Sequence, residues 1–167
     1  MVKGRIGSVS IRTLLTEEFG LEYPIVSAPM GGVAGGRLAA AVSNAGALGL
    51  VGGAYGDPEW LRAELSIARS ESKRPWGVGL ITWHLTRETV ELALSYEPHA
   101  FMISFGDPRS FFPAIKGAGC TLICQVQDVE GGKVAKAAGA DFIVARGMEQ
   151  ATGSSTAPGY AGSCRFA

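Results

Sequence analysis

The sequence has no excess charge of either sign and no long apolar run. Its 167 residues carry 15 Lys and Arg against 15 Asp and Glu, so the formal net charge is zero. A balanced chain offers no basic surface to nucleic acid or to an anionic membrane. No stretch approaches the roughly 20 apolar residues that a membrane-spanning helix needs. We therefore expect neither nucleic acid nor a membrane as a partner.

Cysteine and targeting signals are also scarce. The cysteines are Cys120, Cys124 and Cys164, an odd number, and no apolar signal segment follows Lys3 and Arg5. This usage is typical of a reduced, cytoplasmic protein. Cys120 and Cys124 have a CxxxC spacing without a second pair or a neighbouring histidine, so we expect no metal site.

Short apolar runs dominate what the sequence does contain, and hydrophobic residues make up 47% of it. The runs are continuous rather than alternating, which is typical of parallel strands covered on both faces. In order, they are residues 23–27, 48–51, 77–81, 100–105, 122–126 and 142–145.

Helical segments separate these runs. Residues 57–59 are Asp-Pro-Glu, which combines an N-cap, a proline at the first helical position and an acidic first turn. Leu61, Leu65 and Ala68 then recur on one helical face. The sequence therefore predicts an amphipathic helix after the second run.

The ends of three helical segments share one pattern. Residues 44–47, 116–119 and 138–141 each place glycine where a helix terminates, and a strand follows at once. Thr86 is predicted to begin a further helix, and Asp128 the one that ends at residues 138–141. The recurrence indicates a repeated βα unit.

Repeated βα units build either a closed barrel or an open doubly wound sheet. A dinucleotide fold would have G-x-G-x-x-G after its first strand, and residues 28–36 do not fit that spacing. We therefore favour the barrel, in which the chemistry lies at the carboxyl ends of the strands.

Two blocks resemble the nitronate monooxygenase family. They are residues 23–30, Tyr-Pro-Ile-Val-Ser-Ala-Pro-Met, and residues 38–49, Leu-Ala-Ala-Ala-Val-Ser-Asn-Ala-Gly-Ala-Leu-Gly. Weaker matches follow in the family's order at residues 77–81, 104–108 and 139–145.

The resemblance implies an FMN enzyme on a TIM barrel that oxidises alkyl nitronates with O₂. The expected fold is α/β, an incomplete TIM-type (β/α) barrel of about six βα units of the eight, with an irregular C-terminal tail. Gly79 stands where many members carry a polar residue, and Gln125 where members place a polar side chain near the flavin. The cofactor-binding residues implied by the family are Ala28, Pro29, Met30, Gly31, Gly79 and Gln125.

The chain departs from the family after the sixth run. The family's motif usually reads Gln-Gly-x-Glu-Ala-Gly-Gly-His-Gly, whereas residues 146–153 read Arg-Gly-Met-Glu-Gln-Ala-Thr-Gly. Gly153 takes the place of the histidine and cannot accept a proton, so no catalytic residue is assigned. Nothing after Ala145 resembles the family's last strands, which hold the FMN phosphate. We expect a partial FMN-binding barrel over residues 1–147, and an irregular tail over 148–167 that reflects a frameshift or truncation.

Three hypotheses on function stay open. The first is a nitronate monooxygenase-like enzyme acting on a small nitronate and O₂, of which this chain is an inactive fragment with weak or no FMN binding. The second is a related enoyl reductase on an FMN barrel. The third is a truncated product without function. His84 follows the third run and His99 precedes the fourth, and neither is assigned a catalytic role.

Overall fold

A computed structural model describes residues 11–146, which form one parallel sheet with helices. The strands are β1 (Gly49–Gly52), β2 (Trp76–Ile81), β3 (Ala100–Ser104), β4 (Thr121–Val126) and β5 (Phe142–Ala145). Their order in space is their order in sequence. A doubly wound sheet would reverse its order at a switch point, whereas a barrel continues in one direction. The fold is therefore an incomplete TIM-type (β/α) barrel, as predicted.

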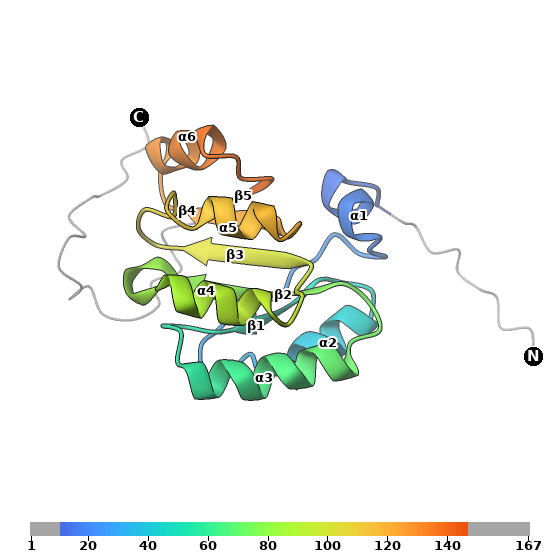
Figure 1. Cartoon of the computed structure of the whole chain (residues 1–167). Helices are drawn as coiled ribbons and strands as arrows, with labels where there is room; N and C mark the ends of the chain where they lie inside the picture. Colours follow the sequence, from blue (N-terminus) through green and yellow to red (C-terminus); the bar gives the residue numbers. More distant parts are fainter. Residues whose placement is uncertain (1–10, 147–167) are drawn as a thin grey trace, which may run out of the picture.

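The helices cover the sheet unequally (Figure 1). Five of them, α2 (Gly36–Asn44), α3 (Pro58–Glu71), α4 (Arg87–Leu94), α5 (Phe112–Gly117) and α6 (Val129–Ala137), follow the chain around its outer face. A 3₁₀ turn, η1 (Thr82–His84), follows β2. Helix α1 (Leu14–Phe19) lies apart, near the end of the sheet where β3 begins.

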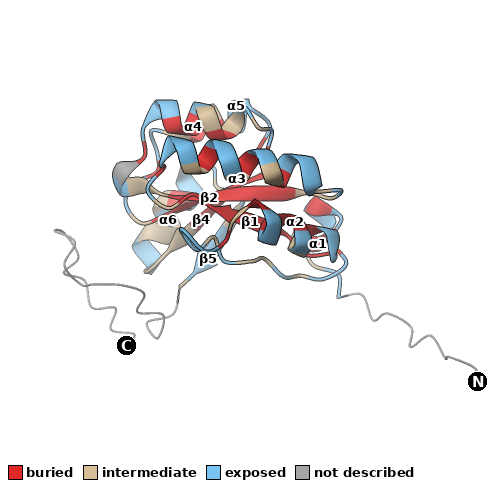
Figure 2. Cartoon of the chain, turned by 90° about the horizontal axis from the view of Figure 1, so that it is seen from below, coloured by how far each residue is buried: buried red, intermediate tan, exposed pale blue. Residues whose placement is uncertain are grey.

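Two separate cores result, one on each face of the sheet. On the outer face, alternate strand residues such as Val78 and Phe101 pack against Leu61 and Leu65 of α3 and their counterparts on α4 and α5. Figure 2 shows these helices buried along one side and exposed along the other. Each fully buried side chain of this kind contributes about 1.5–3 kcal/mol, so the outer core holds each helix to the sheet.

The inner core closes the amino end of the concave face. Phe19 and Leu21 pack there against Leu50, Met102 and Ile123 of the strands. Helix α1 covers this inner core, and its contacts bring the start of the described chain next to the last strands.

Two contacts attach α1 to the far strands. The ring centroids of Phe19 and Phe142 are 6.2 Å apart. The Thr121 hydroxyl donates to a carboxylate oxygen of Glu18 at 2.9 Å. Helix α1 thus reaches from the start of the chain to β4 and β5.

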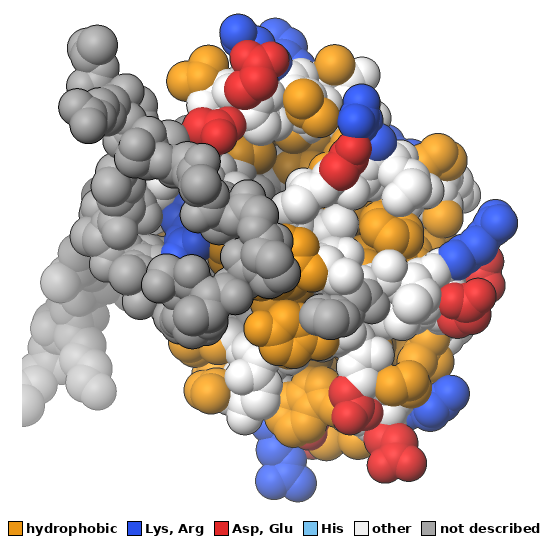
Figure 3. Space-filling view, turned by 90° about the vertical axis from the view of Figure 1, so that its left-hand side faces the viewer, with side chains coloured by type: hydrophobic (Ala, Val, Ile, Leu, Met, Phe, Trp, Pro, Cys, Tyr) orange, Lys and Arg blue, Asp and Glu red, His pale blue; other side chains and the backbone are white. Residues whose placement is uncertain are grey.

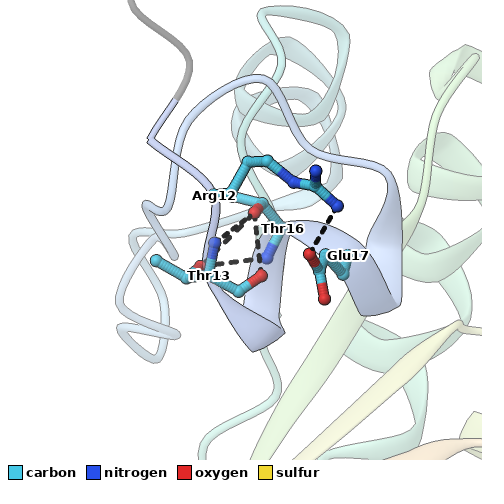
Figure 4. Close-up of polar contacts among 4 residues, drawn as sticks. All are labelled: Arg12, Thr13, Thr16 and Glu17. Carbon is cyan, nitrogen blue, oxygen red and sulfur yellow. Dashed lines mark hydrogen bonds and ion pairs between the residues drawn. The ribbon is translucent and has the colours of Figure 1, made fainter.

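The start of α1 is fixed by a reciprocal cap (Figure 4). The Thr13 hydroxyl accepts from the Thr16 amide at 3.2 Å, and the Thr16 hydroxyl accepts from the Thr13 amide at 2.8 Å. Arg12 pairs with Glu17 at 2.9 Å beside it. A six-residue helix has little stability of its own, so these bonds satisfy amides that would otherwise be unbonded.

The structure corrects the prediction of a full strand over residues 23–27. Only Val26 forms a β-bridge, a parallel one with Leu48 on the outer edge of β1. The Ser27 amide donates to the Leu48 carbonyl at 2.9 Å, but the Leu50 amide then donates to the Ser27 hydroxyl at 2.8 Å. The side chain takes the place of a backbone acceptor, so the ladder ends after one bridge. The first of the six units is present as a bridged segment.

The opposite edge of the sheet is apolar. Ile143 of β5 is 44% exposed and Val144 is 36% exposed. Within residues 11–146, no strand pairs with the outer edge of β5. No helix in this part of the chain has the length and apolar content to cross a bilayer. The predicted tail, residues 148–167, lies outside the described residues.

Candidate functional site

The carboxyl ends of the strands form the face seen in Figure 3. Hydrophobic side chains gather near the middle of this view, and most of the charged side chains lie toward its rim. An apolar centre with few polar groups is typical of a small-molecule site. Five of the six predicted cofactor residues lie where residues 28–31 cross the ends of β1 and β2.

Residues 28–31 pack closely on the strand ends because glycines accept them. A Cβ added at Gly52 would lie 2.3 Å from the Met30 carbonyl oxygen, and one added at Gly31 would lie 2.3 Å from the Ala54 Cβ. A Cβ added at Gly79 would lie 2.4 Å from both Cβ and Cγ of Pro29. The structure therefore brings Ala28, Pro29, Met30 and Gly31 together with Gly79.

The outer surface of this turn is open. Ala28 and Gly31 are exposed, Pro29 is half-buried, and Met30 is 48% exposed. Among the described residues, no hydrogen bond engages the amides of Gly31 and Gly32. The turn thus presents a thioether, a proline ring and backbone donors to whatever approaches the concave face.

Gln125 lies on the same face of the sheet but two strands away from Gly79. Its position in β4 pairs with Ser104 of β3 on one side and Val144 of β5 on the other. Its side chain is half-buried, and the residue lines a cavity of about 250 Å³ between the loop after β3 and α6 that also includes Phe105 and Asp107. Within residues 11–146 it makes no hydrogen bond, so its amide is available to a ligand.

Sequence reasoning missed Ser104 and Phe105. Ser104 is 7% exposed on the inner face, and its carbonyl accepts from the Thr82 hydroxyl at 3.1 Å. Phe105 follows with a positive φ of 61°, which is rare outside glycine. Residues 104–108 were among the weaker family matches, but that match assigned no role to Ser104 or Phe105.

In the loop after β3, the negative charge of Asp107 is paired with the positive charge of Arg109. Asp107 accepts from the Arg109 Nε at 2.9 Å, and hydrogen bonding to Arg109 lowers the pKa of the Asp107 carboxyl. The same interaction raises the pKa of Arg109. The pair gives the loop after β3 a fixed shape without supplying a group that titrates near neutral pH.

No histidine is placed to act as a base among the described side chains. His99 lies at the amino end, beside the Trp76 carbonyl that its amide binds at 2.8 Å. The side chain of His84 and the whole of Gly153, which stands in the family's histidine position, lie outside the described residues. The site, as described, can bind and orient a ligand.

Cys120 and Cys124 are buried on the helix-facing side of β4. Burial, reinforced by the Asp141 carboxylate, raises the pKa of each thiol to about 12. Thiols with such values are protonated at neutral pH and make poor nucleophiles or metal ligands. In residues 11–146, no cluster of His, Cys, Asp or Glu could hold a metal ion.

The open turn offers contacts that a flat ring such as that of FMN could use. Met30 and Pro29 offer apolar contact to a flat ring, and the amides of Gly31 and Gly32 can donate to its polar edge. TIM barrels usually hold phosphate at the loops after the seventh and eighth strands. Residues 11–146 end with β5, so the described residues do not include those loops.

Several known proteins are similar to this chain. Residues 12–84 match the model of the nitronate monooxygenase family. Nitronate monooxygenase of Neurospora crassa is 33% identical over 160 aligned positions, which cover 75% of this chain and 42% of the relative. The (3aS,4S,5R,7aS)-5-hydroxy-7a-methyl-1-oxo-octahydro-1H-indene-4-carboxyl-CoA dehydrogenase of Mycobacterium tuberculosis is 30% identical over 140 positions, which cover 83% of this chain and 39% of the relative.

A solved structure shares the arrangement of the elements. FabK from Thermotoga maritima superposes with a TM-score of 0.78 at 30% identity, covering 83% of this chain and 45% of FabK. The chain thus spans less than half the length of these three proteins. Together the matches confirm the resemblance to nitronate monooxygenases and the TIM-type barrel.

Proposed function

We propose, because residues 12–84 match the nitronate monooxygenase family, that this chain supplies the ring-binding side of an FMN site in a flavin oxidoreductase. The reaction proposed for the whole enzyme is oxidation of an alkyl nitronate by O₂. The observation that carries the proposal is the turn of residues 28–31 packed on Gly79, with an exposed Met30 and with no hydrogen bond among the described residues to the amides of Gly31 and Gly32.

Each residue has a distinct part in this proposal. Pro29 and Met30 exclude water from one face of the ring, and the amides of Gly31 and Gly32 orient its polar edge. Gln125 offers an amide from two strands away. When bound, FMN supplies the redox chemistry, accepting electrons from the substrate and passing them to O₂.

The test is a comparison of FMN with riboflavin, which has the same ring and no phosphate. If only ring contacts are present, the chain binds both weakly and with similar affinity, because no phosphate contact offsets the association cost of about 4–15 kcal/mol. Met30→Ala and Gln125→Ala should weaken both ligands, and His99→Ala, at the amino end, should weaken neither. Tight binding of FMN alone, or equal effects of all three variants, would refute the assigned face.

A second candidate is a flavin-barrel reductase such as an enoyl reductase. It is favoured by the 30% identity to a carboxyl-CoA dehydrogenase and by the likeness to FabK. Such an enzyme uses a nicotinamide cofactor, whereas a nitronate monooxygenase does not. A nicotinamide-oxidation assay on a full-length relative with this same amino-terminal half separates the two.

A further inference from the structure

The cavity of about 250 Å³ beside β4 lies away from the turn proposed to bind the flavin ring. Its walls come from the ends of β3 and β4, the loop after β3 and the first two turns of α6. Residues 28–31 lie instead on the ends of β1 and β2. The described residues that line the cavity include none from that turn and none from β5. The cavity is therefore a feature of two consecutive βα units and not of the open sheet edge. We name it the α6 pocket.

The packing of α6 explains why this space exists. Around the outer face, α3 packs on α2, α4 on α3 and α5 on α4. Helix α6 instead makes its contacts chiefly with β4 and β5. Gly131 and Ala135, one helical turn apart, both line the pocket. Side chains this short leave the space between α6 and the loop after β3 unfilled.

Two consecutive glycines in α6 differ in their relation to the pocket. Glycine lowers the stability of a helix relative to alanine, so a pair of them within one helix needs a reason. Gly131 lines the pocket, whereas Gly132 does not. A Cβ added at Gly131 would lie 3.6 Å from the Val126 Cβ, on the pocket wall. A longer side chain there would take up pocket space, so the bare backbone of Gly131 keeps the pocket open.

The lining of the α6 pocket favours a neutral ligand with an apolar body. Its apolar members are Ile103, Phe105, Pro108, Val126, Val134 and Ala135. The charged lining residues are Asp107 and Arg109, and both carboxylate oxygens of Asp107 accept from the Arg109 guanidinium. A charged ligand would have to break that pair or lose its water without a partner, and both are costly.

One polar group of the lining is available to orient such a ligand. Among the described residues, the half-buried side-chain amide of Gln125 has no hydrogen-bond partner. An amide both donates and accepts, so it can pair with a carboxamide, a carbonyl or a hydroxyl group. Phe105, at the edge of the pocket, has a left-handed φ of 61°. Residues other than glycine keep such a conformation where surrounding structure enforces it, often at ligand sites.

We propose that the α6 pocket binds a small neutral molecule that has an apolar ring or chain and one hydrogen-bonding group, which pairs with Gln125. An apolar cavity of about 150 Å³ can hold benzene, so about 250 Å³ accommodates a ring with one small substituent. Binding at this pocket needs neither flavin nor the turn of residues 28–31.

The experiment is a calorimetric titration of the full chain without flavin, with benzamide as the probe. Acetamide has the same polar group without the ring, and benzoate has the ring with a charge. Benzamide should bind, and acetamide should not bind measurably because it has no apolar body. Benzoate should bind about tenfold or more weakly than benzamide, because its carboxylate would lose water without gaining a partner.

A matched pair of variants tests whether the ligand occupies the pocket. Gly131→Leu should abolish benzamide binding by filling the space, whereas Gly132→Leu, one residue along the helix, should leave it unchanged. Both replace a helical glycine with a better helix former, so neither should lower the unfolding midpoint through propensity. Val134→Phe fills the pocket from the next turn of α6 and should also abolish binding, which keeps the test valid if Gly131→Leu folds poorly.

Gln125→Leu tests the polar end of the ligand. The substitution keeps a side chain of similar size and removes the amide. Benzamide should then bind about two- to tenfold more weakly, as expected for one lost hydrogen bond. Toluene, which has the ring without a polar group, should bind this variant at least as tightly as the wild-type chain.

Three results would overturn the α6 pocket as a ligand site: no binding of benzamide, benzamide that binds both filling variants as tightly as the wild-type chain, or benzoate that binds as tightly as benzamide. Each would do so even if the chain bound flavin as proposed. Conversely, benzamide binding that Gly131→Leu abolishes, in a chain that binds no flavin, would support the pocket and refute the ring site.

Discussion

Pro29 lies directly over the bare backbone of Gly79, so close that a Cβ at Gly79 would approach two Pro29 ring carbons to 2.4 Å. Contact at that separation is impossible, so the absence of a side chain on β2 is what lets the turn after residues 25–27 reach the sheet. The resemblance drew attention to Gly79 as a departure from a polar residue. The structure gives the departure a physical reason, since here the proline takes the space.

Gly79→Ala should therefore destabilise the chain and displace the turn of residues 28–31. Overpacking of this kind costs about 1–3 kcal/mol. The matched control is Gly117→Ala on α5, where a Cβ meets nothing within 4 Å and the helix gains about 0.4–1 kcal/mol. Urea denaturation compares the two, and equal stability of both variants would contradict the close approach.

Phe19→Ala should loosen the amino end of the barrel. Phe19 is 6% exposed and contacts Phe142, and truncating a buried phenylalanine typically costs about 3–5 kcal/mol. Leu14→Ala on the same helix, at a side chain 77% exposed, should change the unfolding midpoint little. If hydrogen exchange at β4 and β5 is equally slow in both variants, α1 does not hold those strands.

Stability should fall with alkaline pH because of Cys120 and Cys124. Burial raises the pKa of both thiols to about 12, whereas an unfolded cysteine titrates near 8.5. The stabilisation is complete below the unfolded value and is lost as the pH rises from there toward 12. In a Cys164→Ser background, urea midpoints measured from pH 8 to 11 should fall less steeply for Cys124→Ala than for its parent. Parallel slopes would show that the thiol does not contribute.

The free edge of β5 should promote self-association. Ile143 and Val144 are exposed beside backbone groups that no described strand pairs, and such edges are templates for pairing with another chain. Ile143→Lys should shift the chain toward monomer in sedimentation experiments, whereas Leu14→Lys, on α1, should not. A wild-type chain that stays monomeric at every concentration would contradict this expectation.

The sequence predicted the elements whose signals are local. Asp57 caps α3, accepting from the amides of Glu59 and Trp60, and all three predicted core residues of that helix are fully buried. The glycines after α2, α5 and α6 adopt left-handed φ values of 96°, 72° and 96°. Caps and terminating glycines act within a few residues, so a single sequence is enough to identify them.

Features that depend on distant contacts were not predictable in the same way. The strand expected over residues 23–27 shortens to a bridge because the Ser27 hydroxyl accepts an amide from β1. Phe105 has a left-handed φ, and the following Gly106 packs close to Thr82 of η1. Phe105 lies beside Trp83 and Arg146 from two other strand ends, and nothing in their spacing indicates that they meet.

The placement of α1 has a consequence for the order in which the chain acquires its structure. Each strand pairs with the one made just before it, so the sheet can grow by one βα unit at a time as the ribosome delivers the chain. Helix α1 is synthesised before the strands described here, yet the partner of its Glu18 is Thr121, 103 residues further along the chain. Contacts of such long sequence separation form late, because loop closure must come first. Among the described elements, the first to be synthesised is therefore expected to dock after the strands it covers, and until then the apolar inner face of the new sheet lacks this cover.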